Sequence, residues 1–160
     1  MEKLKYYMKE IAIFIVIVTV LSNVISFYKS SGLNKNSLNN IESTLVNKYF
    51  KLSNEKPLLI HFWATWCPTC KLEASNIEYI SQNYNVITVA VKSDNITKYM
   101  KENNLTFKVI EDKDSMISQK FNISAYPTTF IYDKNKNLIF SEVGYTSSFG
   151  LWIRMFISSL

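Results

Sequence analysis

Cysteine, glycine, proline and histidine are scarce in this chain of 160 residues, which contains two, three, three and one of them respectively. Two cysteines are too few for a disulfide-stapled scaffold. The scarcity of glycine and proline argues against a loop-rich or fibrous protein. A block of like charge is also lacking, because the 18 Lys and Arg and the 13 Asp and Glu residues are dispersed, with a formal net charge of +5. A nucleic-acid-binding face would gather basic residues, so we expect no nucleic-acid partner.

The chain does contain enough apolar residues for one folded domain. Hydrophobic residues make up 48% of it and charged residues 19%, a balance typical of proteins that bury a core and not of disordered chains. A length of 160 residues suits one globular domain with a tail, and not two full domains.

One uncharged apolar run near the N-terminus predicts a membrane anchor. Residues 11–28 contain no charge and no helix breaker, and their number is near the lower limit of the roughly 17–25 residues that cross a bilayer as a helix. Lys3, Lys5 and Lys9 precede the run, and Lys29 follows it. Because positive residues tend to stay in the cytoplasm, the three N-terminal lysines favour an N-terminus inside the cell.

From this run we predict four segments. Residues 1–10 form a cytoplasmic N-terminus, residues 11–28 a single transmembrane anchor, residues 29–44 a polar tether, and residues 45–160 a folded domain. The protein would then lie in the inner (cytoplasmic) membrane with its folded domain facing the periplasm or the cell exterior.

Two alternatives compete with the anchor: a cleaved signal peptide and a buried helix. Residues 11–21 have nearly the length of the apolar region of a signal peptide, but no convincing A-x-A cleavage site follows them. No cysteine follows either, which excludes a lipoprotein anchor. A buried helix would show polar residues at a helical period, and residues 11–18 show none. The anchor and the cleaved signal both place the domain outside the cytoplasm.

The rest of the chain alternates between strand and helix patterns, which indicates an α/β fold. Apolar runs and alternation predict strands at 58–64, 86–91, 107–110, 128–132 and 138–142. Helices are predicted at 67–83, 94–103, 114–121 and 147–158, the second with Ser93 or Asp94 as its cap. The polar turn at 133–137 joins the last two strands as a hairpin, so the central sheet is mixed and flanked by helices. A short edge strand is also expected within 45–52.

The two cysteines form a C-x-x-C motif at the predicted start of the helix over 67–83, with Pro68 in its first turn. A thiol at a helix N-terminus faces unpaired N–H groups and the positive end of the helix dipole, so its pKa falls below the free value of about 8.5. Only the thiolate attacks a disulfide. The spacing places Cys70 one turn below Cys67, which predicts Cys67 as the exposed attacking thiol and Cys70 as the buried resolving thiol.

Functions of the cysteine pair other than redox chemistry fit the sequence less well. A zinc site needs more ligands than two cysteines and the single histidine, His61, which lies in a strand, so we expect no metal. A purely structural disulfide would close a tiny loop and stabilise little. A non-catalytic copper- or thiol-binding module is disfavoured by the two-cysteine inventory and by the scattered methionines Met100, Met116 and Met155.

The run FWATWCPTC (Phe62 to Cys70), followed by Lys71-Leu72-Glu73, resembles the thioredoxin fold, specifically its extracytoplasmic TlpA/ResA/CcmG branch. The segment SAYPTTFIYD (Ser124 to Asp133) resembles the G-x-P-T-T-F-L-I-D segment of that branch. The resemblance covers residues 56–157. Within the branch, the short anchored form is most similar to the suppressor-of-copper-sensitivity D type (ScsD) of protein disulfide oxidoreductase.

This resemblance implies an enzyme that exchanges electrons between its Cys67/Cys70 pair and protein thiols or disulfides, without a bound cofactor. A reductase is the favoured direction, and a membrane electron-transfer partner of the DsbD type is then implied. The narrower alternative is a thiol reductase dedicated to cytochrome c maturation, in which CPTC also occurs.

The resemblance also assigns residues around the cysteines. Pro127 corresponds to the cis-proline whose loop lies against the C-x-x-C, so that the backbone of Tyr126 would pair with an extended substrate. Trp66, Pro68 and Thr69 would complete the substrate-binding surface.

Two acid–base helpers are predicted beside the cysteines. Glu73 shares a helical face with Cys70, and burial would raise its pKa and let it take the Cys70 proton; the alternative is a carboxylate at the helix rim. His61 takes the place of a buried Asp or Asn in related proteins and could shuttle protons near pH 6.5. A core histidine that is simply hydrogen-bonded is the alternative.

Overall fold

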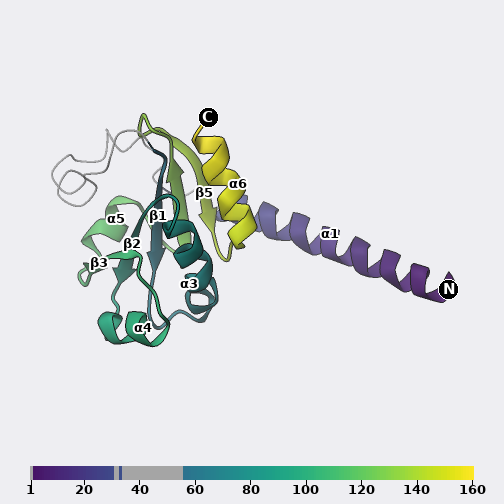
Figure 1. The fold of residues 1–160 in the computed structure, drawn as a ribbon, viewed down its shortest axis with the longest axis horizontal. Coiled ribbons are helices and arrows are strands. Elements are labelled where there is room, and N and C mark those ends of the chain that lie inside the picture. The colour runs from purple at the N-terminus through teal and green to yellow at the C-terminus, as the bar shows by residue number, and fades with distance from the viewer. Residues whose placement is uncertain (1, 31–32, 34–55) are drawn as a thin grey trace.

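The computed structural model describes residues 2–30, 33 and 56–160. Within them, a long N-terminal helix precedes an α/β domain (Figure 1). Most of the predicted tether at 29–44 and the whole of the edge strand expected within 45–52 lie outside the described residues.

Five strands form one mixed sheet in the order β3-β2-β1-β4-β5. The parallel part consists of β1 (Leu58–Trp63), β2 (Asn85–Val91) and β3 (Lys108–Asp112). The antiparallel part consists of β4 (Thr128–Tyr132), which pairs with β1, and β5 (Leu138–Val143). The predicted α/β fold with a mixed sheet and a terminal hairpin is thus confirmed.

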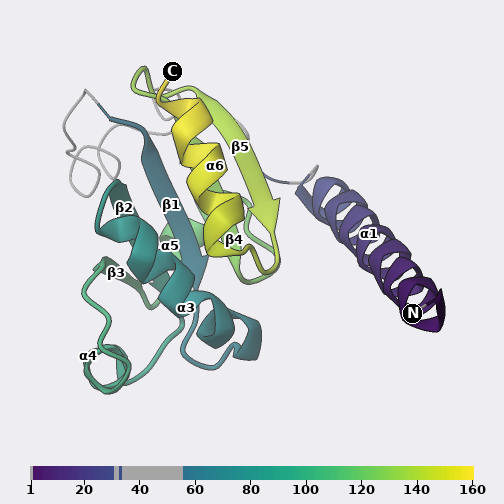
Figure 2. The same cartoon turned by 45° about the vertical axis from the view of Figure 1, so that its right-hand side comes forward.

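Helices cover both faces of this sheet. The two neighbours α3 (Pro68–Ser81) and α6 (Ser148–Ser158) lie on one face, and α5 (Met116–Lys120) lies on the other (Figure 2). Every residue of β1 is buried, as expected for a central strand enclosed on both faces. Its side chains alternate, so Leu59 and Trp63 pack toward α3 and α6, while Phe62 packs toward α5.

The helix predicted over 94–103 is shorter than expected, and its predicted caps are wrong. It is α4 (Ile96–Glu102), and its N-cap is Asn95, which adopts a left-handed backbone and makes no capping hydrogen bond through its side chain. The Ser93 hydroxyl instead accepts from the backbone N–H of Thr65, at 3.0 Å. Ser93 therefore fastens the loop that carries the cysteines and does not start a helix.

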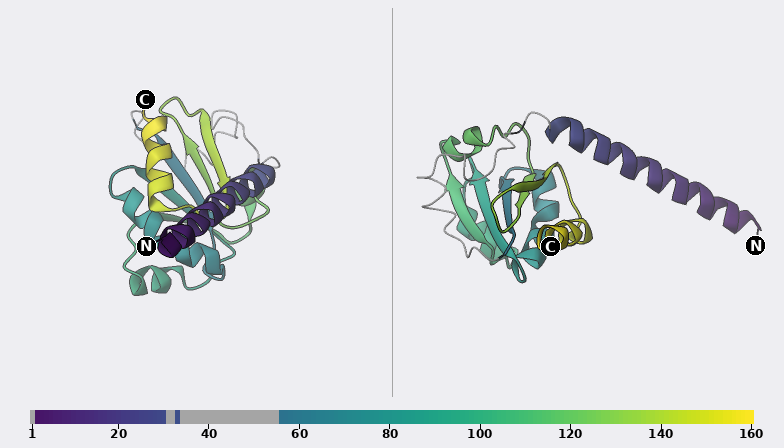
Figure 3. Two further views of the ribbon diagram at one scale, coloured as in Figure 1. Left: turned by 90° about the vertical axis from the view of Figure 1, so that its right-hand side faces the viewer. Right: turned by 90° about the horizontal axis from the view of Figure 1, so that it is seen from above.

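The N-terminal helix α1 (Glu2–Ser30) projects from the domain, with its N-terminus at the far end (Figure 3). It begins before the predicted anchor, so residues 2–10, expected as a separate terminus, belong to the same helix. In the part of the chain that the structure describes, no helix is long and apolar enough to cross a membrane.

Candidate active site

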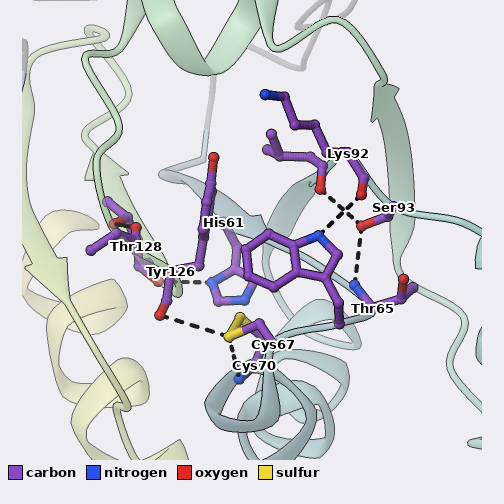
Figure 4. The surroundings of a disulfide bond; sticks show 12 residues. His61, Thr65, Cys67, Cys70, Lys92, Ser93, Tyr126 and Thr128 are labelled. Carbon is purple, nitrogen blue, oxygen red and sulfur yellow. Dashed lines mark hydrogen bonds between the residues drawn. A yellow bond between two sulfur atoms is a disulfide. The ribbon is translucent and has the colours of Figure 1, made fainter.

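The C-x-x-C motif lies where β1 ends and α3 begins, at the carboxyl edge of the parallel strands (Figure 4). Cys67 is the N-cap of α3, and its Sγ accepts a hydrogen bond from the backbone N–H of Cys70, at 3.2 Å. Pro68 follows in the first turn, as predicted, where its missing N–H costs no intrahelical hydrogen bond. A disulfide joins Cys67 and Cys70, whose Cα atoms are 5.3 Å apart.

The two cysteines differ in exposure in the predicted order, but Cys67 is less accessible than predicted. Its relative exposure is 6%, against 1% for Cys70. The carbonyl oxygen of Tyr126 lies 3.7 Å from the Cys67 Sγ, so the loop before β4 stands over this sulfur. The prediction of an exposed attacking thiol is therefore wrong, and a substrate must reach the Cys67 sulfur past neighbouring residues.

The loop before β4 contains the one cis peptide bond of the described residues, between Tyr126 and Pro127, which confirms the expected cis-proline. Pro127 is buried, and its carbonyl accepts from the N–H of Gly144, at 2.8 Å. The Thr128 hydroxyl donates to the carbonyl of Ala125, at 2.7 Å. These bonds hold the loop against the cysteines from the side opposite α3.

Trp66 is the most exposed large side chain beside the disulfide, at 56%. Its indole N–H donates to the carbonyl of Lys92, at 3.0 Å. Its ring meets that of Tyr126 edge to face, with centroids 5.7 Å apart. Pro68 is exposed and Thr69 is half-buried. Of the predicted substrate-binding residues, Pro127 alone is buried.

Sequence reasoning missed the residues that fix this rim from the end of β2. Lys92 supplies the carbonyl for Trp66, and the Asp94 carbonyl accepts from the Thr65 hydroxyl, at 3.2 Å. The available signal was positional: Lys92, Ser93 and Asp94 directly follow a strand that runs parallel to β1, so both strand ends meet at one edge of the sheet.

Glu73 is fully buried on the inner face of α3, together with Cys70, Ala74 and Ile77. One carboxylate oxygen accepts from the backbone N–H of Thr146, at 3.1 Å, and the other has no protein partner. Burial raises the pKa of Glu73 to about 8, and the Thr146 hydrogen bond opposes that rise only in part. The acid is therefore a buried group that stays protonated near neutral pH, and not a carboxylate at the helix rim.

His61 lies in the middle of β1 and its side chain shares the sheet face of Leu59 and Trp63, toward α3. Its Nδ1 is 2.9 Å from the Thr129 hydroxyl, on the residue paired with it in β4. Burial lowers the pKa of His61 to about 3. The ring is then neutral at physiological pH, which disfavours a proton shuttle that depends on the imidazolium form.

No group of three or more His, Cys, Asp or Glu side chains that could hold a metal ion occurs among residues 2–30, 33 and 56–160. The site's chemical groups are two sulfurs, one buried carboxyl and one neutral imidazole. Such a set can transfer electrons and protons between thiols and disulfides.

Similar known proteins support the assignment of this site to thiol–disulfide exchange. The sequence pattern of the Redoxin family matches residues 34–149. A thioredoxin-like protein of Haemophilus influenzae is 28% identical over 149 residues, covering 91% of this chain and 88% of that protein. The thiol:disulfide interchange protein DsbE of Escherichia coli is 30% identical over 97 residues, or 58% of this chain, which spans only 52% of that protein.

A similar solved structure is that of a secreted disulfide oxidoreductase of Mycobacterium tuberculosis homologous to Escherichia coli DsbE. It has a TM-score of 0.59 and 24% identity, covering 68% of this chain and 85% of that one. At this identity the likeness establishes the thioredoxin-like fold alone.

The raised pKa of Glu73 predicts a loss of stability with rising pH. The folded state keeps the proton that the unfolded chain releases above pH 4.5. The free energy of unfolding should therefore fall by about 1.4 kcal/mol per pH unit from pH 4.5 to about 8. Glu73→Gln keeps the acceptor for Thr146 and should remove this slope in urea unfolding of the oxidised protein. Equal slopes in both proteins would contradict the assignment.

The lowered pKa of His61 predicts that the free energy of unfolding rises with pH on the acidic side, the opposite of the Glu73 effect. Below pH 6.5 the unfolded chain binds a proton on His61, whereas the folded protein binds it only below about pH 3. The free energy of unfolding should therefore fall by about 1.4 kcal/mol per pH unit as the pH drops through this window. His61→Asn should abolish that loss. It should also leave the pH profile of thiol exchange unchanged between pH 5 and 8. A shifted kinetic profile would instead support the proton shuttle.

Proposed function

Because the chain belongs to the Redoxin family and is a thioredoxin-fold thiol–disulfide oxidoreductase, we propose that it acts outside the cytoplasm, on a membrane anchor, as a reductase of protein disulfides. The observation that carries the thiol–disulfide chemistry of this proposal is the Cys67 sulfur at the N-terminus of α3, which accepts a hydrogen bond from the Cys70 N–H. An extracytoplasmic location agrees with the secreted disulfide oxidoreductase whose fold this chain shares.

The reaction begins with the reduced pair. The Cys67 thiolate attacks one sulfur of a substrate disulfide, the substrate S–S bond breaks, and one substrate thiolate leaves. The Cys70 thiol then loses its proton and attacks the Cys67 sulfur, which releases the second substrate thiolate and forms the Cys67–Cys70 disulfide. Two electrons pass to the substrate in this sequence.

The first turn of α3 favours the attacking thiolate. Its Sγ accepts the Cys70 N–H, and the positive end of the dipole of the 14-residue helix lies at the same place. Such contacts contribute about 0.3–1 kcal/mol each, up to ~2 when partly buried. This is on the order of one pKa unit, which increases the thiolate fraction at neutral pH.

Glu73 in its ionised form is the proposed base for Cys70; with a pKa of about 8, this is the minority form of the group at neutral pH. The two residues are three apart on α3, and both are buried on its inner face. The pKa of Glu73, about 8, is close to the ordinary thiol value of about 8.5, so a proton can pass between them at little cost. The carboxyl oxygen without a protein partner is available for this transfer.

A substrate would bind across the exposed rim of the site. The backbone of Tyr126 lies 3.7 Å from the Cys67 sulfur and can pair with an extended peptide that places its own disulfide there. The Trp66 ring, Pro68 and Thr69 would contact the same peptide from the α3 side. Pro127 holds the loop in place.

Over its described residues α1 does not meet the length and apolarity of a membrane-spanning helix, so the anchor proposal rests on the exposed surface of α1. Large apolar side chains between Ile11 and Ile25 are more than 40% exposed, and residues 11–28 carry no charge. Such a surface is costly in water and favourable in lipid.

A tethered reductase must regain electrons from another protein dithiol, and we propose a membrane partner of the DsbD type, as in the ScsD-type proteins that the short anchored form resembles. A role confined to cytochrome c maturation is the second candidate, supported by the CPTC motif and the likeness to DsbE.

Replacement of the resolving thiol should trap the substrate. Cys70→Ala leaves the mixed disulfide on Cys67 without an internal attacker, so non-reducing gels should show adducts that reductant removes. Cys67→Ala is the matched control, because it lacks the attacking thiol and should show none. Equal adducts in both variants would contradict the unequal roles of the two sulfurs.

The direction of electron flow is tested by the state of the pair in cells. Acid quenching followed by alkylation of free thiols should show Cys67 and Cys70 mostly reduced, because the electron donor of a reductase keeps its cysteine pair reduced. A pair found mostly oxidised would support an oxidase instead.

The anchor is tested by washing membranes with alkaline carbonate. The full-length chain should stay in the membrane pellet, since α1 would be held by hydrophobic contact and not by charge. Release of an intact chain would contradict the anchor, and release of a shortened chain would indicate a cleaved signal peptide.

A further inference from the structure

The last helix presents an apolar surface to solvent. We call this surface the outer α6 face; it consists of five side chains with exposures of 43–85%, four of them on α6 and the last just beyond its end: Phe149, Trp152, Phe156, Ile157 and Leu160. The side chains of Trp152 and Phe156, one turn apart, stack with their ring centroids 5.7 Å apart and an interplanar angle of 10°.

The opposite side of α6 already has its partners, so the outer face is not a displaced core surface. Leu151 and Met155 are fully buried in the cluster that contains Ile77 and Ile131. The helix is therefore docked on the domain through one stripe, while a second apolar stripe faces away from it.

No charged side chain interrupts the outer α6 face. The only charged residue of the helix is Arg154, and its guanidinium is paired with Glu142 at 3.0 Å and donates to the Gly150 carbonyl. It lies 5.9 Å from the centroid of the Phe140 ring, against the domain. Soluble proteins rarely leave a contiguous aromatic surface uncovered, and such surfaces mark interaction sites.

We propose that the outer α6 face docks on the lipid surface of the membrane in which α1 is anchored. The inference rests on the proposed anchor. Three observations favour lipid as the occupant. Tryptophan and other aromatic side chains prefer the lipid–water interface. The face lacks unpaired charged side chains, which would oppose its burial in lipid. The α1 helix contacts β5, and α6 and β5 lie on the side of the domain from which α1 projects (Figure 1).

Docking through α6 would fix the height of the disulfide above the bilayer. The start of α6 and the segment before it are bonded to α3: Glu73 accepts from the Thr146 N–H, and Asn76 accepts from the Ser148 hydroxyl, at 2.7 Å. A domain held by both α1 and α6 would therefore present Cys67 close to the membrane surface, where a membrane-embedded electron donor can reach it.

Tryptophan quenching by lipid tests the proposal on the full-length chain. The protein is reconstituted in phosphatidylcholine vesicles whose acyl chains carry bromine, a contact quencher. We expect quenching of the wild type that Trp152→Phe loses, because the reporter is removed. Trp66→Phe, which removes the other exposed tryptophan, should retain it.

A second pair of variants tests the contact itself. Phe156→Ser should reduce the quenching of Trp152, while Met116→Ser, which changes an exposed apolar residue of α5 on the other face of the sheet, should not. A vesicle-bound chain with no quenching that depends on Trp152 would overturn the docking and leave the anchor intact. Cross-linking of two chains through α6, with Trp152 unquenched, would assign the face to a second copy. A chain that does not float with the vesicles would overturn both proposals.

Discussion

The first turn of α3 leaves backbone N–H groups without partners inside the helix, and the sulfur of Cys67 accepts one of them. This contact starts the helix, places both sulfurs within bonding distance, and favours a negative sulfur. Other features of the site converge on it. Trp66 and Tyr126 narrow the approach to that sulfur, and β1 ends where the helix must begin. Reactivity here follows from a helix-capping requirement that the sulfur satisfies.

The interior beside the cysteines is polar but uncharged near neutral pH. Burial raises the pKa of Glu73 and lowers that of His61, so between about pH 3 and 8 both groups are neutral on the same side of the sheet. This arrangement avoids the cost of a buried ion and still keeps, on the helical face of the resolving thiol, a carboxyl group whose ionised form can accept a proton. As a consequence, the domain is stable over a narrower pH range. Its free energy of unfolding falls above pH 4.5 because of Glu73 and below pH 6.5 because of His61.

Two exposed apolar surfaces of the described residues lie outside the catalytic core, on α1 and α6. Neither is needed to complete the sheet or its two packed faces, since the core residues of the domain are already covered. Because α6 lies on the side of the domain from which α1 projects (Figure 1), an anchor at α1 would also orient the active site relative to the membrane. The thioredoxin-like domain would then be held at the membrane by two separate contacts.

The sequence by itself determined the features that depend on near neighbours in the chain. The spacing of Cys67 and Cys70, the start of α3 at Pro68, and the alternation of strands and helices follow from local periodicity and capping. Only the tertiary structure decided the contacts that join distant residues: Cys67 with Tyr126, His61 with Thr129, and Glu73 with Thr146, separated by 59, 68 and 73 positions. These depend on strand register and on how α6 docks on α3. For that reason the sequence could assign roles to the two sulfurs, while the burial of Cys67 and the neutral state of His61 emerged only from the fold.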